Sequence, residues 1–425
     1  MGIFLTISMI ILLVFGFPMF ILLLLPTFFS MELFFAHIPI QSLIQRIAGG
    51  VEPFPLVAVP LFIFSADIMV RGDMSRRLVN FAEKIVGHLT GGLAHTTILA
   101  CGIFGAISGS NQAAVAAIGG NMHDSLIERG YKQSFSTALI VNASDLSQLI
   151  PPSILLIMFG VITGSSVGAL FLAGIGPAVV LGLGFMFYCR YWAKKNNIPL
   201  RPRASLLEIF RAFLGAAIPI GLAVIIIGGI YGGIFTPTEA AGVAVLYALL
   251  SELLIFKTIR FRDIYKVALK SGKTTALVFI LIGAAETFAW MLTIARIPRA
   301  ITEFMLTFAP SPIIFLLIMN VIFFIALMFF NPLSAMVILT PLFFPVARAF
   351  GIDPLHMGAL IALNGAVGSA TPPFGVDLFT ACAVFKLPYE KVVKGVFPFI
   401  AIGLLTLILL SLIPQIATFL PNLVF

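Results

Sequence analysis

Small polar residues gather at four points in a chain whose sequence is otherwise strongly apolar. Two of these points, Ser108-Gly109-Ser110-Asn111 and Asn331-Pro332, lie at the middles of apolar regions. The other two lie beside the proline pairs Pro151-Pro152 and Pro372-Pro373. Hydroxyl, amide, carboxylate and carbonyl oxygens are the ligands that a hard cation prefers, and interrupted helices supply them inside a membrane. Binding chemistry is therefore expected at these four points.

These points provide two sets of candidate ligands for Na⁺. The candidates are Ser108, Gly109, Ser110, Asn111, Asn142, Ser144 and Asp145 in the first half, and Asn331, Ser334, Asn364, Gly365, Gly368, Ser369 and Thr371 in the second. The glycines would contribute backbone carbonyls. The alternative is that these residues only cap helix ends. Their occurrence in two related clusters favours ion sites.

If the interrupted helices belong to a transporter, the same four points would also contact the transported molecule, the cargo. The candidate cargo-binding residues are Ser108, Ser110, Asn111, Asp145, Pro151, Pro152, Thr371, Pro372 and Pro373. No Lys or Arg lies in the predicted core. An anionic cargo would therefore have to be held by half-helix N-termini, hydroxyls, amides and bound cations.

Five acids lie inside apolar segments, where an acid is costly and usually functional. They are Asp67, Asp145, Glu239, Glu286 and Asp377. Asp145 is the best side-chain candidate for cation binding because it lies inside the first helix break. Glu239 follows Thr236-Pro237-Thr238, a pattern that favours helix capping. For Asp67 and Glu286, a role as paired structural groups and a functional role are equally compatible with the sequence.

Composition limits where the protein acts. Of 425 residues, 60% are hydrophobic and only 10% are charged, which is typical of a membrane protein and leaves no room for a soluble catalytic domain. The 25 Lys and Arg lie in short clusters between apolar runs, which favours membrane topology over nucleic-acid binding. The chain lacks HExxH, P-loop and CxxC motifs, so an enzyme is not indicated.

Apolar windows of about 20 residues predict nine membrane crossings. The predicted spans are 2–29, 53–70, 133–163, 168–192, 213–235, 238–256, 274–295, 356–385 and 395–420. The regions 91–122 and 313–347 are interpreted as re-entrant hairpins because their middles are polar or proline-marked. With a cytoplasmic amino terminus and an external carboxyl terminus, only Arg46, Arg296, Arg299 and Arg348 lie outside.

The two halves of the chain are related. A shift of 221 residues aligns Gly130 with Gly351, Pro151-Pro152 with Pro372-Pro373, and Ser110 with Asn331. Each proline pair must interrupt its helix, the first near Asp145 and the second within 364–373. The predicted fold is an all-α polytopic membrane protein with two inverted repeats, each holding a hairpin and a broken helix. This pattern indicates a secondary transporter that binds its cargo at the midplane.

Several motifs carry a more specific resemblance. They are Gly105-Ala106-Ile107-Ser108-Gly109-Ser110, Ala113-Ala114-Val115-Ala116-Ala117-Ile118-Gly119, Leu149-Ile150-Pro151-Pro152-Ser153, Phe171-Leu172-Ala173-Gly174-Ile175, Phe235-Thr236-Pro237-Thr238-Glu239-Ala240-Ala241 and Thr371-Pro372-Pro373-Phe374-Gly375. With these motifs, almost the whole chain resembles the large membrane subunit of TRAP (tripartite ATP-independent periplasmic) transporters. The resemblance implies Na⁺-driven uptake of an organic acid across the bacterial inner membrane.

The resemblance also implies partners and movement. The partners would be a small membrane subunit of four helices and a soluble periplasmic substrate-binding protein. An elevator-type movement would divide the chain into scaffold spans and an arm (1–90), the first hairpin and broken helix of the transport domain (91–165), scaffold spans with a connecting helix and second arm (166–312), the second hairpin and broken helix (313–394) and a last span (395–425).

Sialic acid or a C4-dicarboxylate is the expected cargo, with a slight preference for sialic acid. The main rival is a stand-alone Na⁺/carboxylate symporter that needs no binding protein. Two further rivals are an intramembrane hydrolase that uses Ser108 and a purely structural subunit.

Overall fold

The computed structural model describes residues 1–425, and all of its secondary structure is helical. The first half contains α1 (Gly2–Val14), α2 (Met19–Phe34), α3 (Ile40–Gly49), η1 (Phe54–Val57), α4 (Ala58–Arg71), α5 (Met74–Val86), α6 (Gly92–Ser108), α7 (Asn111–Ala114), η2 (Val115–Gly119), α8 (Gly120–Glu128), α9 (Gln133–Ala143), α10 (Leu146–Leu149), α11 (Ile154–Thr163) and α12 (Val167–Lys195). The second half contains α13 (Leu206–Tyr231), α14 (Pro237–Leu250), η3 (Ser251–Ile255), α15 (Phe261–Ile294), α16 (Ile297–Phe308), α17 (Pro312–Leu327), α18 (Pro332–Ala349), α19 (Pro354–Ser369), α20 (Val376–Phe385), α21 (Tyr389–Val393), α22 (Phe397–Leu412) and α23 (Gln415–Val424).

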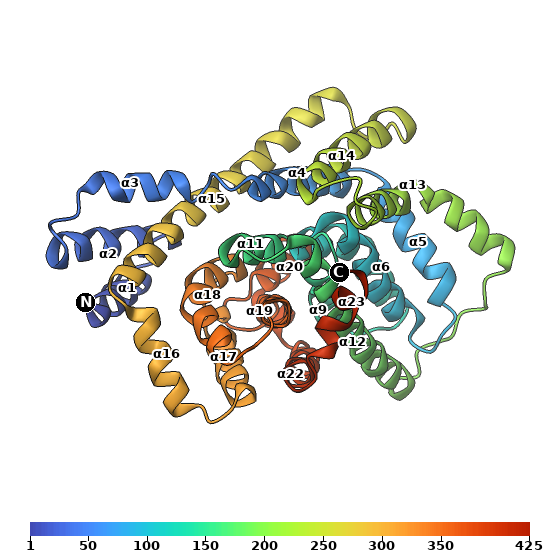
Figure 1. Ribbon diagram of the computed structural model, residues 1–425. Coiled ribbons are helices and arrows are strands. Elements are labelled where there is room, and N and C mark those ends of the chain that lie inside the picture. The colour runs from blue at the N-terminus through green and yellow to red at the C-terminus, as the bar shows by residue number, and fades with distance from the viewer.

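The helices form two groups. In Figure 1 the long helix α15 crosses one side of the molecule beside α3 and α4, while α17, α19 and α22 lie on the other side. We call α1–α5 and α13–α16 the outer layer, and α6–α12 and α17–α23 the core bundle. In the core bundle α12 packs against α6, α10 and α19, and α22 packs against α12 and α19. The core bundle contains both hairpins and both proline pairs.

Helices α4 and α15 pack side by side in opposite directions. Near one end Arg71 pairs with Asp263 at 2.5 Å, and further along Asp67 pairs with Lys270 at 2.6 Å. Beyond the other end of α4, Gly50 lies against Glu286. The contacts therefore move toward the end of α15 as they move toward the start of α4, so the two helices are antiparallel.

The same two helices are counterparts in the repeat. The 221 residues that separate Pro151 from Pro372 also relate α4 to the second part of α15, α5 to α16, α6 to α17, α9 to α19 and α11 to α20. Both proline pairs contain a cis peptide bond. Since counterparts α4 and α15 run in opposite directions, the structure confirms the prediction of two inverted repeats, each with a hairpin and a broken helix.

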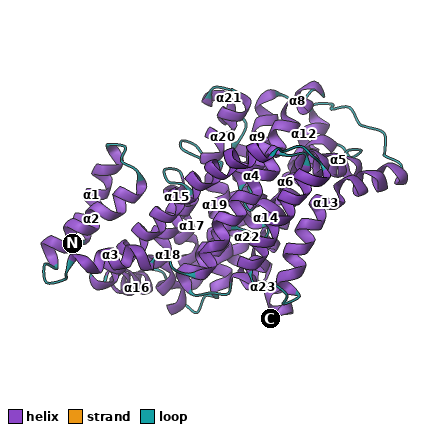
Figure 2. Cartoon of the chain, turned by 90° about the horizontal axis from the view of Figure 1, so that it is seen from above, coloured by secondary structure: helices purple, strands orange, loops and turns teal.

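The predicted first span, 2–29, is wrong. The structure has two short helices, α1 and α2, which pack together and are joined by a turn at Gly16, whose φ is +74°, and Pro18. Figure 2 shows this helical hairpin at one end of the molecule. The region is apolar throughout, so hydropathy alone does not reveal the turn. The repeat explains the turn. A shift of 221 residues places α1 on the end of α13 and α2 on α14, and these two helices are also separate.

Because α1 and α2 turn back on each other, the amino terminus lies on the side opposite to the predicted cytoplasmic one, given the orientation predicted for the other segments. Gly2 lies against Ile297, beside Arg296, which the charge pattern places outside. The chain thus begins on the external side if the rest of the predicted orientation holds.

The lengths of the helices give fewer membrane crossings than the nine that were predicted. Six helices are long and apolar enough to cross a membrane, and two bent pairs raise the number to eight. One bent pair replaces the predicted span 395–420, because the chain turns by 59° between α22 and α23. After this turn α23 packs against α12.

Candidate functional site

Each hairpin tip packs against the broken helix of its own repeat. At the first tip, a Cβ on Gly109 would lie 2.1 Å from the carbonyl oxygen of Pro152. At the second tip, the carbonyl of Met328 accepts a hydrogen bond from the backbone N–H of Phe374 at 3.2 Å. The prediction that tips and breaks come together is confirmed in both halves.

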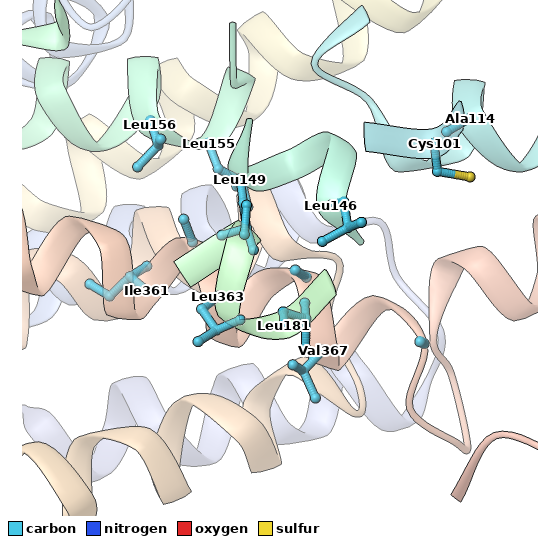
Figure 3. Packing of buried hydrophobic residues seen from close by; sticks show 14 of the residues in the cluster. Cys101, Ala114, Leu146, Leu149, Leu155, Leu156, Leu181, Ile361, Leu363 and Val367 are labelled. Carbon is cyan, nitrogen blue, oxygen red and sulfur yellow. The ribbon is translucent and has the colours of Figure 1, made fainter. Parts of the chain in front are cut away.

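The two repeats also meet each other at this place. Asn111, at the first tip, donates a side-chain hydrogen bond from Nδ2 to Oδ2 of Asp377 in the first turn of α20. On α19, Gly365 lies close to Leu155 and Gln148 of the first break and to Pro332 of the second tip. Figure 3 shows apolar side chains of this region, among them Leu149 and Leu155 beside the first break and Leu363 of α19, and both α10 and α11 pack against α19. The four points thus form one cluster.

In the first break the helix α9 ends at Ala143, and a single turn, α10, follows before the proline pair. Asp145 is 1% exposed, and neither of its carboxylate oxygens has a hydrogen-bond partner. Asn142 donates from Nδ2 to the carbonyl of Ala138 at 2.8 Å, and Ser144 donates to the carbonyl of Val141 at 2.6 Å. Their oxygens remain available as acceptors.

The second break begins later than predicted. The helix α19 continues to Ser369, so Asn364, Gly365 and Gly368 lie within it and not in an unwound stretch. Inside an apolar region an intact helix satisfies its own backbone groups, which explains why the helix continues through these glycines. Both glycines instead allow close packing, Gly365 against Leu155 and Gly368 against Leu327.

Side chains of the second break are mostly bonded locally. Ser369 donates to the carbonyl of Gly365, and Thr371 donates to the carbonyl of Val367, both at 2.8 Å. Asn364 donates from Nδ2 to Oδ1 of Asn320 at 2.8 Å, and Asn320 in turn donates to Ser411 at 2.8 Å. This buried chain of hydrogen bonds links α19 to α17 and α22.

At the tips, the capping alternative holds for two candidates. Ser110 accepts from the N–H of Ala113 at 3.3 Å, and Asn331 accepts from the N–H of Ser334 at 2.9 Å, so each caps a helix. Ser108 is fully buried and accepts from the N–H of Ser110 at 3.4 Å. Asn331 is exposed, whereas the hydroxyl of Ser334 is buried without a partner.

Oxygen atoms without partners dominate the cluster. They are both carboxylate oxygens of Asp145, Oδ1 of Asp377, Oε1 of Gln148, Oδ1 of Asn364 and Oγ of Ser334. None of the 25 Lys and Arg residues is buried. A buried acceptor without a donor is unfavourable, and a buried carboxylate without a positive charge is more so. The donor set therefore fits a hard cation.

Sequence reasoning missed three residues of this cluster as binding candidates: Asp377, Gln148 and Asn320. Asp377 was recognised as an intramembrane acid but not as a partner of the first tip, which lies 266 residues away. Gln148 follows Asp145 by one helical turn, a spacing that could have suggested it. For Asn320, no local pattern in α17 indicates its contact.

The other intramembrane acids have distinct surroundings. Glu239 forms the predicted capping box with Thr236 at the start of α14. Asp67 is paired, with Lys270 at 2.6 Å and with Ser271 at 2.7 Å. Glu286 is exposed on α15. A further acid, Glu252, is fully buried and accepts from the backbone N–H groups of Asp73 and Met74.

The family model described as "Tripartite ATP-independent periplasmic transporter, DctM component" matches residues 6–416. The chain belongs to this family. It is therefore the large permease of a TRAP transporter, an integral membrane protein, and the resemblance noted from its motifs is confirmed.

Relatives of this TRAP permease are named for different cargoes. It is 46% identical to the ectoine TRAP transporter large permease protein TeaC of Halomonas elongata, over 98% of each chain. It is 39% identical to the C4-dicarboxylate TRAP transporter large permease protein DctM of Pseudomonas aeruginosa, over 92% of this chain and 91% of the relative. It is 33% identical to the sialic acid TRAP transporter large permease protein SiaM of Vibrio cholerae, over 89% of each. These relatives are transporter permeases rather than enzymes.

Solved structures of other transporters share the fold. The YdaH transporter of Alcanivorax borkumensis superimposes with a TM-score of 0.60 at 14% identity, covering 88% of each chain. Neisseria gonorrhoeae MtrF, described with a class of antimetabolite efflux pumps, gives 0.56 at 15% identity over 88% of this TRAP permease and 83% of that chain. At such low identity the likeness concerns the fold alone.

Proposed function

We propose that this TRAP permease imports ectoine or a closely related zwitterionic solute across the bacterial inner membrane, coupled to Na⁺. A small membrane subunit of four helices and a periplasmic binding protein would be its partners, in accordance with the tripartite family. The observation that carries the proposal is the meeting of both hairpin tips and both helix breaks around buried, unpartnered oxygens, with no buried Lys or Arg.

The proposed cargo is inferred from the named relatives and from the charges of the buried site residues. TeaC, named for ectoine, shares 46% identity with this chain, against 39% for DctM and 33% for SiaM. Ectoine carries one carboxylate and one cyclic amidinium cation, so its net charge is zero. A site that contains two buried acids and no buried base suits such a molecule better than a dianion. We therefore favour ectoine over the sialic acid or C4-dicarboxylate expected from the sequence.

We propose that Na⁺ binds at Asp145. The two free carboxylate oxygens of Asp145 supply charge, and Asn142 and Ser144 supply further oxygens from the same break. A bound Na⁺ would offset the cost of burying this carboxylate. Among the remaining predicted ligands, Ser108, Asn364 and Thr371 belong to the same proposal.

The proposal includes an elevator-type movement of the core bundle against the outer layer. Residues 91–165 and 313–394 would move together, because the two repeats are joined by the bond between Asn111 and Asp377. We extend the moving part to α12 and α22, since both pack against α19. The outer layer, held together by the contacts between α4 and α15, would stay fixed.

Uptake into proteoliposomes tests the proposed function. Vesicles containing this chain and its small subunit receive labelled ectoine, sialic acid or succinate, with or without the binding protein and an inward Na⁺ gradient. We expect ectoine uptake that requires both additions. Uptake without the binding protein would instead favour a stand-alone symporter. Uptake of sialic acid or succinate alone would contradict the proposed cargo.

Asn142→Ala tests the Na⁺ site. The Nδ2 group of Asn142 bonds only within its own helix, to Ala138, so the substitution leaves no other side chain without a partner. We expect at least tenfold weaker stimulation of uptake by Na⁺, since one ligand to a charged group is lost. The melting temperature without Na⁺ should change little. Unaltered Na⁺ stimulation would rule out this ligand.

A further inference from the structure

The core bundle contains two buried carboxylates and no buried positive charge to balance them. Asp145 and Asp377 are 1% and 0% exposed, and both belong to the cluster in which Asn111 of the first tip bonds to Asp377. Buried charges persist only when they are paired or neutralised. If both groups are ionised, two positive charges must come from molecules that bind. Na⁺ at Asp145 supplies only one of them.

The two carboxylates differ in how they are held. Neither oxygen of Asp145 has a partner, which suits a small ion that approaches both. In Asp377, Oδ2 accepts from Asn111 and only Oδ1 is free. The bond from Asn111 fixes the carboxylate plane, so Asp377 presents one oriented acceptor. An oriented charged acceptor suits an N–H donor on a positively charged group.

Two nearby amide oxygens also favour a ligand with N–H donors, independently of the two acids. Oε1 of Gln148 and Oδ1 of Asn364 have no partner, and their residues are 8% and 0% exposed. Gln148 lies one turn after Asp145, and both Gln148 and Asn364 flank the close approach at Gly365. The cluster thus offers acceptors but no buried basic donor. Its ligand must bring both N–H donors and positive charge.

We infer that Asp377, positioned by Asn111, binds the positively charged nitrogen group of the cargo and so selects zwitterions over purely anionic acids. The inference rests on the proposed function, which supplies the zwitterionic cargo class. A planar amidinium presents N–H donors in its own plane and matches a carboxylate oxygen of fixed orientation. Asp145 keeps the Na⁺, and the two positive charges offset the two carboxylates.

The test compares two ligands of similar size on the purified complex of this chain with its small subunit, at a fixed Na⁺ concentration. Ectoine has the ring, the carboxylate and the cation, whereas cyclohexanecarboxylate has the ring and carboxylate only. We expect Asp377→Asn to weaken ectoine binding by about ten- to hundredfold. Binding of cyclohexanecarboxylate should stay the same or strengthen, because a negative charge has been removed.

A matched control is available at the start of α19. Asp353 is an exposed N-cap that accepts from the N–H of Leu355 at 2.7 Å, and Asn caps helices as well as Asp does. Asp353→Asn should leave both affinities unchanged. A second test variant, Asn111→Ala, frees the carboxylate without removing its charge, so ectoine affinity should fall by several-fold only. Na⁺-dependent thermal stabilisation reports whether each variant is folded.

The outcomes separate this inference from the proposed function. If wild-type protein binds ectoine and Asp377→Asn binds it equally well, the inference fails and the proposed function stands. Equal losses for both ligands would show a structural role for Asp377 and would also overturn the inference. If wild-type protein prefers the purely anionic ligand, the proposed cargo itself is wrong.

Discussion

Gly109 turns the first hairpin at a point where a side chain has no room. Its φ is +60°, a left-handed conformation that costs other residues about 1–2 kcal/mol. A Cβ would also lie 2.1 Å from the carbonyl oxygen of Pro152. The tip and the first break are therefore in direct backbone contact, and one methyl group is enough to separate them.

Gly109→Ala should destabilise the protein by about 2–5 kcal/mol, because backbone strain and overpacking act together. Gly164 provides the control: its φ is +70°, but no atom lies within 4 Å of its missing Cβ. Gly164→Ala should cost only the strain of about 1–2 kcal/mol. The melting temperatures of the two variants in detergent measure the difference. Equal shifts would contradict the close contact at the tip.

At the scale of elements, Glu252, in η3 directly after α14, holds the start of α5 within the outer layer. This buried carboxylate accepts from two backbone N–H groups at the start of α5, those of Asp73 and Met74, and from the hydroxyl of Thr258. It lies so close to Gly72 that a Cβ there would overlap it. The amphipathic helix α5 then packs against α6, the first arm of the hairpin. Glu252 thus sets the place from which that hairpin starts.

Glu252→Gln should destabilise the protein by about 1–3 kcal/mol, since the amide replaces one acceptor oxygen with a donor that faces other donors. Glu239→Gln is the control, because Glu239 accepts comparable bonds from Thr236 in an exposed capping box. Its cost should stay at or below about 1 kcal/mol. Thermal unfolding measured by the fluorescence of the two tryptophans provides the comparison. A larger loss in the Glu239 variant would refute the anchoring role of Glu252.

At the scale of the whole molecule, an open cavity of about 250 Å³ lies at one place on the boundary between the outer layer and the core bundle. Ser75 and Arg76 line it from α5, and Ala117 and Asn121 line it from η2 and α8. Its walls belong to the two different groups, so a movement of one group against the other would change the distance between these residues. The cavity is therefore a suitable place to test the proposed movement.

A cysteine pair at Ser75 and Ala117 should lock the transporter. Cys101 and Cys189 are buried, so replacing Cys382 is enough to prepare the background. Cross-linking by Hg²⁺ should reduce uptake at least tenfold, and added thiol should restore it. Each single-cysteine variant, treated in the same way, is the control. Full uptake by the cross-linked pair would contradict movement at this boundary.

Labelling tests the revised orientation of the first two helices. In the same background, Phe17→Cys at the turn between α1 and α2 should react with an impermeant maleimide from the cytoplasmic side only. His37→Cys, beyond the end of α2, should react from the external side only. A single long span would leave position 17 inside the membrane and unlabelled from both sides.

The sequence predicted those features that depend on local patterns. Thr236 and Glu239 predicted a capping box, and the two proline pairs predicted two broken helices, all of which the structure contains. The hairpin of α1 and α2 was missed because the first basic residue is Arg46, so no charge reports the turn near Gly16. The bond between Asn111 and Asp377 was missed because no periodicity links residues 266 positions apart.

That long-range bond also has a consequence for biosynthesis. Asn111 leaves the ribosome long before Asp377, and the first hairpin must enter the membrane while its polar tip lacks this partner. Neither repeat can complete the cluster alone, since each provides one side of the bond. The cluster is therefore among the last parts to assemble, and a nascent chain interrupted before α20 carries a polar hairpin tip that a membrane quality-control protease could recognise.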